Sequence, residues 1–214
     1  MRQFTPFEAS ETMHRSRQCL AAAAASRAWL EVQIRGGATR RIDVDLFASK
    51  CPMACENFAK LCSGDNVLPF TAAKDTIQET TFKDQFRPQL SYVRSTFHRV
   101  VPGFVVQGGD IVKGNGEGNM SVFGEEFDAP AERGAVPLDA AGLIATAVSA
   151  PTQNGSQFFI TLSEKGAPHL NGSCICFGRV AKASMDVIKE IERQEVDFEG
   201  RPLEDIVIVA AGSK

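Results

Sequence analysis

The feature that most limits the fold of this 214-residue chain is a succession of short strand-forming runs separated by glycine and proline. In residues 42–46, apolar and acidic residues alternate with a period of two, which is typical of a half-buried strand. Residues 28–34 precede this run across a Gly36-Gly37 turn, so the pair predicts an antiparallel hairpin. Further short strands are predicted at 104–107, 143–148, 157–162, 174–180 and 205–211.

Two helices are predicted within this body of strands. Pro52 begins the first, and Gly64 ends it. Its apolar face consists of Ala54, Phe58, Leu61 and Cys62. The second runs from about Ser184 to Arg193. Many short strands with two helices favour an antiparallel sheet that closes or stacks on itself over a βαβ fold.

The length predicts one domain with additional segments rather than two domains, at roughly 150 residues per domain. Residues 1–27 form a predicted N-terminal extension that is helical, because Thr5 and Glu8 make a capping box ahead of helix-forming residues. A transit peptide is the alternative for this segment, although its two glutamates argue against one. The remaining domain, 28–214, is interrupted by a long connection at 65–96, interpreted as an insertion.

Composition excludes some classes of function. The 23 basic and 26 acidic side chains give a net charge of −3, which does not indicate nucleic-acid binding. No run of 18 apolar residues predicts a membrane-spanning helix. The six cysteines are interpreted as reduced thiols, since a chain of this size can build a core without disulfides. A cytoplasmic location is therefore expected, with mitochondrial or nuclear locations as alternatives.

Common catalytic motifs are missing from the sequence. It holds neither a phosphate-binding loop nor a nucleophile elbow, and Gly114, Gly116 and Gly118 are interpreted as turn residues. Four of the six cysteines can be combined into a zinc site on paper. They lack the usual two-residue spacing, however, and are better interpreted as buried thiols. The cysteines concerned are Cys51, Cys55, Cys174 and Cys176.

Three segments carry the functional information. Residues 97–110, FHRVVPGFVVQGGD, place Arg99 inside an otherwise apolar stretch. Residues 154–160 read NGSQFFI, and residues 176–180 read CFGRV. Together these segments resemble the signature segments of the cyclophilins, the peptidyl-prolyl isomerases that bind cyclosporin. The resemblance covers about 28–212 outside the insertion and includes the following shorter pieces: Leu46-Phe47, Glu56-Asn57-Phe58 and Leu61-Cys62-Ser63-Gly64.

The resemblance implies a mainly β fold: a closed eight-stranded antiparallel β-barrel capped by two α-helices. It implies rotation about Xaa-Pro bonds as the reaction, and this rotation requires no nucleophile, metal or cofactor. The expected partners are proline-containing peptides and proteins, together with cyclosporin-type inhibitors that bind weakly, and the expected state is a monomer. The alternative function is a binding module that holds proline segments within a larger complex without turnover.

The resemblance also assigns roles to individual residues. Arg99 matches the catalytic arginine, and Gln107 matches the glutamine that orients the arginine and the substrate. The proline ring is expected to lie in an apolar hole lined by Phe104, Val105, Phe159 and Leu170. The residue before proline is expected to lie along Ala147, Val148 and Gln157. Phe158, one residue along the strand from Phe159, is predicted to be core.

The sequence departs from the family pattern at the pocket rim. Val148 stands where the family usually has asparagine, His169 where many members have tryptophan, and Cys174 where a pocket histidine is frequent. The segment 163–168 ahead of His169 is two residues longer than usual. These three residues are still expected to contact the substrate, and the rim is the part of the site most altered.

Overall fold

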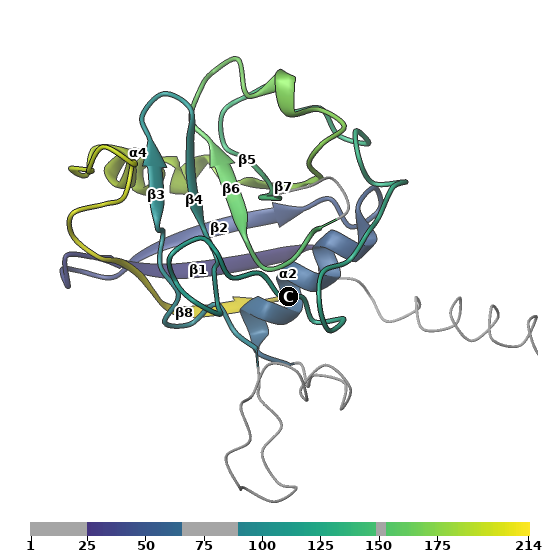
Figure 1. Cartoon of the computed structure of the whole chain (residues 1–214), viewed down its shortest axis with the longest axis horizontal. Coiled ribbons are helices and arrows are strands. Elements are labelled where there is room, and N and C mark those ends of the chain that lie inside the picture. Colours follow the sequence, from purple (N-terminus) through teal and green to yellow (C-terminus); the bar gives the residue numbers. More distant parts are fainter. Residues whose placement is uncertain (1–24, 66–89, 149–152) are drawn as a thin grey trace, which may run out of the picture.

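The computed structural model describes residues 25–65, 90–148 and 153–214 (Figure 1). The described chain is mainly β, with one sheet of eight antiparallel strands and two α-helices. The strands are β1 (Arg27–Ile34), β2 (Arg40–Leu46), β3 (Arg99–Val101), β4 (Val105–Gly108), β5 (Leu143–Thr146), β6 (Phe158–Thr161), β7 (Cys176–Val180) and β8 (Ile206–Ser213). The helices are α2 (Pro52–Ser63) and α4 (Met185–Glu192), and the short 3-10 turns are η2 (Pro168–Leu170) and η3 (Lys182–Ser184).

Most predicted elements are confirmed. The β1–β2 hairpin, both helices and the five later strands lie within a few residues of their expected positions. Strand β3 was missed, because its three residues, Arg99–Val101, are too few to show an alternating pattern. The sheet runs in the order β3-β4-β6-β5-β7-β2-β1-β8.

The sheet is curled but open, so the expectation of a closed eight-stranded barrel is corrected. Its edges are β3 and β8, and the ladder does not continue from one to the other. Because β3 is so short, the chain just before it approaches β8 instead, through a single bridge between Thr96 and Val207. Three backbone hydrogen bonds of 2.8–2.9 Å accompany this bridge: Arg94 N–H to Ile208, Phe97 N–H to Ile206 and Ile208 N–H to Ser95.

An aromatic cluster fills the core between the sheet and α2. The Phe158 ring lies 5.4 Å from both the Phe58 and Tyr92 rings, edge-on to each, and is 1% exposed. The prediction that Phe158 packs in the core is therefore confirmed. The Tyr92 hydroxyl donates a 2.7 Å hydrogen bond to the Ser156 carbonyl. Residues 90–96 of the predicted insertion are thus part of the domain, while 66–89 lie outside the described residues.

Helix α2 is capped at its N-terminus from a distant part of the chain. Its N-cap residue, Cys51, makes no side-chain capping bond. Instead, the buried carboxylate of Glu132 accepts hydrogen bonds from the backbone N–H groups of Met53 at 2.7 Å and Ala54 at 3.1 Å. A carboxylate at this end satisfies free N–H groups and is stabilised by the helix dipole. At the other end Gly64, with φ of 69°, adopts the left-handed conformation predicted for a glycine stop.

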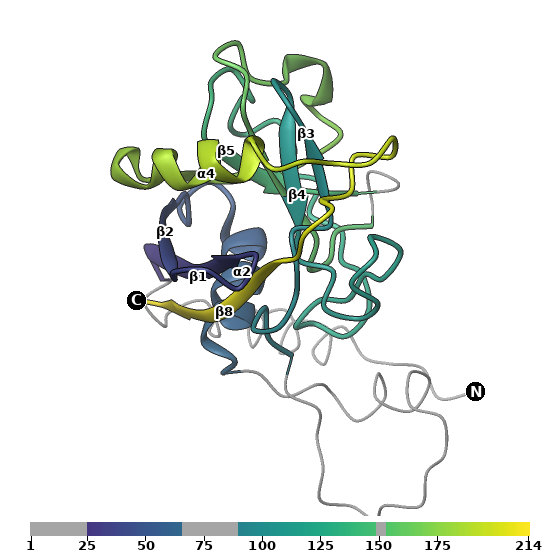
Figure 2. The same cartoon turned by 90° about the vertical axis from the view of Figure 1, so that its left-hand side faces the viewer.

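Helix α4 supports the strands that carry the site (Figure 2). Its buried face consists of Val187, Ile188 and Ile191. From its last residue, the Glu192 carboxylate accepts a 2.7 Å hydrogen bond from the Gly103 N–H, which fixes the turn between β3 and β4. Within the described ranges, neither helix has the length and apolar character needed to cross a membrane.

The structured domain begins before the predicted boundary at residue 28. Strand β1 starts at Arg27, whose backbone exchanges hydrogen bonds of 3.2 and 2.8 Å with Lys214. The Ser26 N–H donates to Lys214, and the Ser26 carbonyl accepts from Leu46, each at 2.9 Å. Residues 1–24 of the predicted helical extension lie outside the described residues.

Two truncations test this boundary. We expect a chain lacking residues 1–27 to be less stable than one lacking 1–24 by about 2 kcal/mol, or roughly 4–8 °C in Tm, because four backbone hydrogen bonds are lost. Differential scanning calorimetry of the two truncated chains, side by side, measures the difference. Equal melting temperatures would contradict the placement of residues 25–27 in the sheet.

Candidate active site

The register of three neighbouring strands places the predicted catalytic residues in one row. Arg99 of β3 is paired with Gln107 of β4, and Gln107 is paired with Phe159 of β6. Phe159 is paired in turn with Ala145 of β5. Side chains at paired positions project from the same face of a sheet, so Arg99, Gln107 and Phe159 lie side by side above one face.

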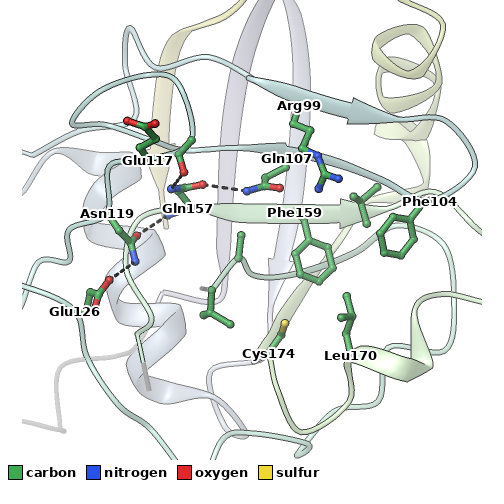
Figure 3. A pocket seen from close by; sticks show the side chains of 14 residues that line it. Arg99, Phe104, Gln107, Glu117, Asn119, Glu126, Gln157, Phe159, Leu170 and Cys174 are labelled. Atoms are coloured by element: carbon green, nitrogen blue, oxygen red, sulfur yellow. Dashed lines mark hydrogen bonds between the residues drawn. The ribbon is translucent and has the colours of Figure 1, made fainter. Parts of the chain in front are cut away.

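A cavity of about 320 Å³ opens over this row (Figure 3). All of the predicted site residues except His169 line it. Its complete lining is Arg99, Phe104, Val105, Gln107, Gly116, Glu117, Asn119, Glu126, Ala147, Val148, Gln157, Phe159, Leu170 and Cys174. The structure therefore brings together residues that are up to 75 positions apart in the sequence, from 99 to 174.

One end of the cavity is apolar. Phe104 and Leu170 line it beside the Phe159 ring, which is only 5% exposed (Figure 3). Cys174 forms part of the same wall, and burial raises the pKa of its thiol to about 11. A wall of neutral, apolar groups of this kind excludes water and fits a small hydrocarbon ring.

His169 does not line the cavity, but its ring packs against Phe104, which does. It is exposed in the 3-10 turn η2, next to Leu170. Its ring stacks on that of Phe104, with ring centres 5.5 Å apart and an interplanar angle of 24°. The position predicted for contact with the substrate is thus at the outer rim, one aromatic ring away from the apolar hole.

The other end of the cavity is built from amide side chains. Gln157 Nε2 donates to the carbonyls of Gly116 at 2.9 Å and Gly118 at 2.7 Å. Its Oε1 accepts a 3.0 Å hydrogen bond from Gln107 Nε2. This leaves Gln107 Oε1 directed toward Arg99 (Figure 3). The Arg99 guanidinium itself makes no hydrogen bond or ion pair with the part of the chain that the structure describes, so its donors face the cavity.

The loop that holds Gln157 is organised around the Asp110 carboxylate. Five backbone N–H groups donate to it at 2.8–3.2 Å, those of Val112, Lys113, Asn115, Gly116 and Gly118. Burial by itself raises the pKa of Asp110, but these backbone hydrogen bonds outweigh burial and lower the pKa overall. Gly116 has a φ of 92°, and a Cβ there would approach His98 Cδ2 to 2.9 Å, so this position requires glycine.

Several residues that line the cavity or hold its side chains were missed by sequence reasoning. Gly116 and Gly118 were interpreted as turn residues only, although their carbonyls hold Gln157. Glu117, Asn119 and Glu126 carried no motif, because they reach the cavity through a loop that leaves the sheet after β4. The glycine-rich spacing of 114–118 was the one available sign that the backbone there approaches a binding site.

Comparison with known proteins assigns the family. The sequence model described as cyclophilin type peptidyl-prolyl cis-trans isomerase/CLD matches residues 30–213. The chain belongs to the cyclophilin family. It is 38% identical over 182 residues to the NK-tumor recognition proteins of mouse and human, covering 85% of this chain and 11% of theirs.

Other relatives are named as isomerases. Peptidyl-prolyl cis-trans isomerase 9 of Caenorhabditis elegans is 34% identical over 190 residues, which cover 89% of this chain and 55% of that protein. Peptidyl-prolyl cis-trans isomerase cyp11 of Rhizopus delemar is 33% identical over 186 residues, covering 87% and 49%. This cyclophilin chain spans about half the length of these isomerases.

Two buried cysteines of this cyclophilin donate their thiols to backbone carbonyls. Cys51 Sγ donates to the Cys176 carbonyl, and Cys55 Sγ donates to the Phe177 carbonyl, each at 3.2 Å. All five cysteines in the described ranges are free, and burial raises the pKa of Cys51 to about 11. In those ranges, no three His, Cys, Asp or Glu residues are grouped so as to hold a metal ion.

The Asp110 loop gives a stability test with a defined pH dependence. A carboxyl whose folded pKa is lowered adds stability above its unfolded pKa of about 3.9, and this is lost as the pH falls through the lower folded value. We therefore expect Asp110→Asn to cost about 2 kcal/mol at pH 7, or roughly 4–8 °C in Tm, and less below about pH 4.

Melting curves between pH 3 and pH 8 measure this difference. The matched control is Asp139→Asn, which changes an exposed carboxylate and should melt like the parent chain. A constant difference across the whole pH range would show that the charge of Asp110 is not what stabilises the loop.

Proposed function

We propose that this cyclophilin domain catalyses cis/trans isomerisation of Xaa-Pro peptide bonds in peptides and proteins. The observation that carries the proposal is the row formed by Arg99, Gln107 and Phe159, which sets a cation, an amide and an aromatic ring against one cavity. The names of the two isomerase relatives support it.

The reaction requires the protein to favour a twisted amide. Amide resonance opposes rotation with a barrier of about 18–20 kcal/mol, and uncatalysed rotation about an Xaa-Pro bond takes tens to hundreds of seconds. No covalent bond is broken during the rotation. Catalysis therefore needs interactions that are stronger in the twisted state than in either planar state.

Arg99 supplies such an interaction. In the twisted state resonance is lost, and the prolyl nitrogen becomes pyramidal and gains a lone pair. The guanidinium of Arg99, which faces the cavity, donates a hydrogen bond to this nitrogen or to the neighbouring carbonyl. A guanidinium group carries a delocalised positive charge and several N–H donors. Because resonance delocalises the lone pair of a planar amide nitrogen, a hydrogen bond to the nitrogen forms only as the amide twists.

The remaining groups hold the peptide in position. The proline ring lies in the apolar hole beside Phe159, where the excluded water can no longer compete for the Arg99 donors. Gln107 is fixed by Gln157, so its Oε1 is held toward the arginine and the substrate. The residue before proline lies along Ala147 and Val148 at the cavity edge.

We also propose an oligomeric state and a cellular compartment for the protein. A monomer is supported by the cavity, since one chain supplies the full set of lining residues described above. A cytoplasmic or other reducing compartment is supported by the five free cysteines in the described ranges.

The second candidate function is a proline-binding module without turnover. It is favoured by the altered rim, where Cys174 and Val148 replace polar residues frequent in the family.

The first test of the isomerase proposal is Arg99→Ala. We expect kcat/KM to fall by about 100-fold or more, because removing one transition-state donor from a desolvated site has effects of this size. The fold should persist, since Arg99 is exposed and fills no core space. NMR exchange spectroscopy on a short Xaa-Pro peptide measures turnover without a coupling protease.

Arg179→Ala is the matched control, because Arg179 is also an exposed strand arginine but lies on β7 away from the cavity lining. It should turn over the peptide at the parent rate. An Arg99→Ala variant that turns over the peptide as fast as the parent would contradict the isomerase proposal. Peptide binding with no turnover by the parent would favour the binding module.

The second test concerns cyclosporin, which we expect this protein to bind more weakly than do family members with tryptophan at the position of His169. Tryptophan offers a larger apolar face and an indole N–H donor. At the rim position beside Phe104, His169→Trp should therefore tighten inhibitor binding while changing turnover of short peptides little. Isothermal titration calorimetry of both chains decides this, and unchanged or weaker binding would exclude His169 from the inhibitor rim.

A further inference from the structure

The cavity is electrically polarised along its length. Glu117 and Glu126 line the end beyond Gln157, with Asn119 between them, and Phe104 lies at the opposite end (Figure 3). Among the described lining residues, the one cation is Arg99, which lies toward the apolar end. The amide end of the cavity therefore presents negative charge.

Glu126 is held at the cavity wall by its neighbours. Asn119 Nδ2 donates a 3.3 Å hydrogen bond to Glu126 Oε1 and a 3.2 Å bond to the Gln153 carbonyl. Asn119 Oδ1 accepts from the Gln157 N–H at 3.5 Å, so the same side chain links Glu126 to the strand that carries Phe159. The carboxylate consequently has a defined place beside Gln157.

Glu117 is available to a ligand cation. Its partner is Lys113, whose Nζ lies 3.3 Å from Glu117 Oε2, and the two side chains are 55% and 68% exposed. Ion pairs this exposed contribute little stability, because water solvates both charges. A lysine or arginine of a bound peptide can therefore replace or join Lys113 at this carboxylate.

The direction of a bound peptide follows from the proposed function, on which this inference rests. With the proline beside Phe159 and the preceding residue along Ala147 and Val148, the chain continues toward Gln157. Each further residue advances the peptide by at most about 3.3–3.6 Å. The second residue before proline is thus the first one to reach the end lined by Glu117 and Glu126.

We propose that Glu117 and Glu126 select substrates in which the second residue before proline is lysine or arginine. The substrate class is a basic residue, any residue, then proline. A neutral residue at that position gains no attraction from the two carboxylates, and an acidic residue is repelled by both. Arg99 does not compensate, since it lies toward the apolar end with the proline (Figure 3).

Three peptides test the proposal, acetyl-Xaa-Ala-Pro-Phe-amide with Xaa as Lys, Gln or Glu. We expect kcat/KM in the order Lys, Gln, Glu, with Lys exceeding Glu by about threefold to tenfold at low salt. The preference should shrink at 0.5 M NaCl, since salt screens exposed charges. In the Glu117→Gln/Glu126→Gln variant the ratio of Lys to Glu should approach one.

Glu125→Gln is the matched control. It removes the same charge from the neighbouring exposed residue, which does not line the cavity, so it should keep the parent ratio. NMR titrations of the same peptides give Kd for each. Absence of turnover with every peptide would overturn the proposed function alone, because the Kd ratio still reports on the glutamates. Equal kcat/KM and equal Kd for the three peptides, or a ratio unchanged in the double variant, would overturn this proposal.

Discussion

The pairing register of β3, β4 and β6 is the constraint on which the site depends. It sets Arg99, Gln107 and Phe159 in one row across the sheet. Side chains alternate between faces with a period of two, so a slip of one residue would turn Gln107 or Phe159 into the opposite layer. Phe158 lies in that opposite layer, where core aromatic rings enclose it. A side chain shifted into this layer would be buried in the core and lost from the cavity. Packing in the hydrophobic core thus sets the strand register, and the register determines which side chains face the cavity.

A second layer of support lies outside the sheet. Asp110 gathers the backbone of residues 112–118, and the carbonyls of that loop orient Gln157. Gln157 orients Gln107, and Glu192 fixes the turn beside Phe104. Two carboxylates that never reach the cavity therefore position groups that do. Side chains held in this way require little reorganisation when a peptide binds, which is the condition for strong transition-state hydrogen bonds.

Sequence reasoning predicted every strand except the three-residue β3, both described helices and most of the cavity, since periodicity and three motifs carry that information. It failed where the decisive contact is long-range. Tyr92 fell in an apparent insertion because its burial depends on Phe58 and on the carbonyl of Ser156. A closed barrel was expected, but β3 and β8 do not pair as strands. The contact with β8 is made instead by an irregular segment at Thr96. Glu117 and Glu126 were missed because exposed loop glutamates look alike in a sequence.

The capping of α2 by Glu132 has a consequence for how the chain is made. The N–H of Ala54 donates to the carboxylate of Glu132, which lies 78 residues further along the chain and is synthesised later. At a synthesis rate of about 5–20 residues per second, that carboxylate is added roughly 4–16 s after the helix. The nascent helix therefore keeps free N–H groups at its first turn until much of the sheet has been translated. The last hydrogen bonds at the start of this helix therefore form only after residue 132 has been added, late relative to the helix itself.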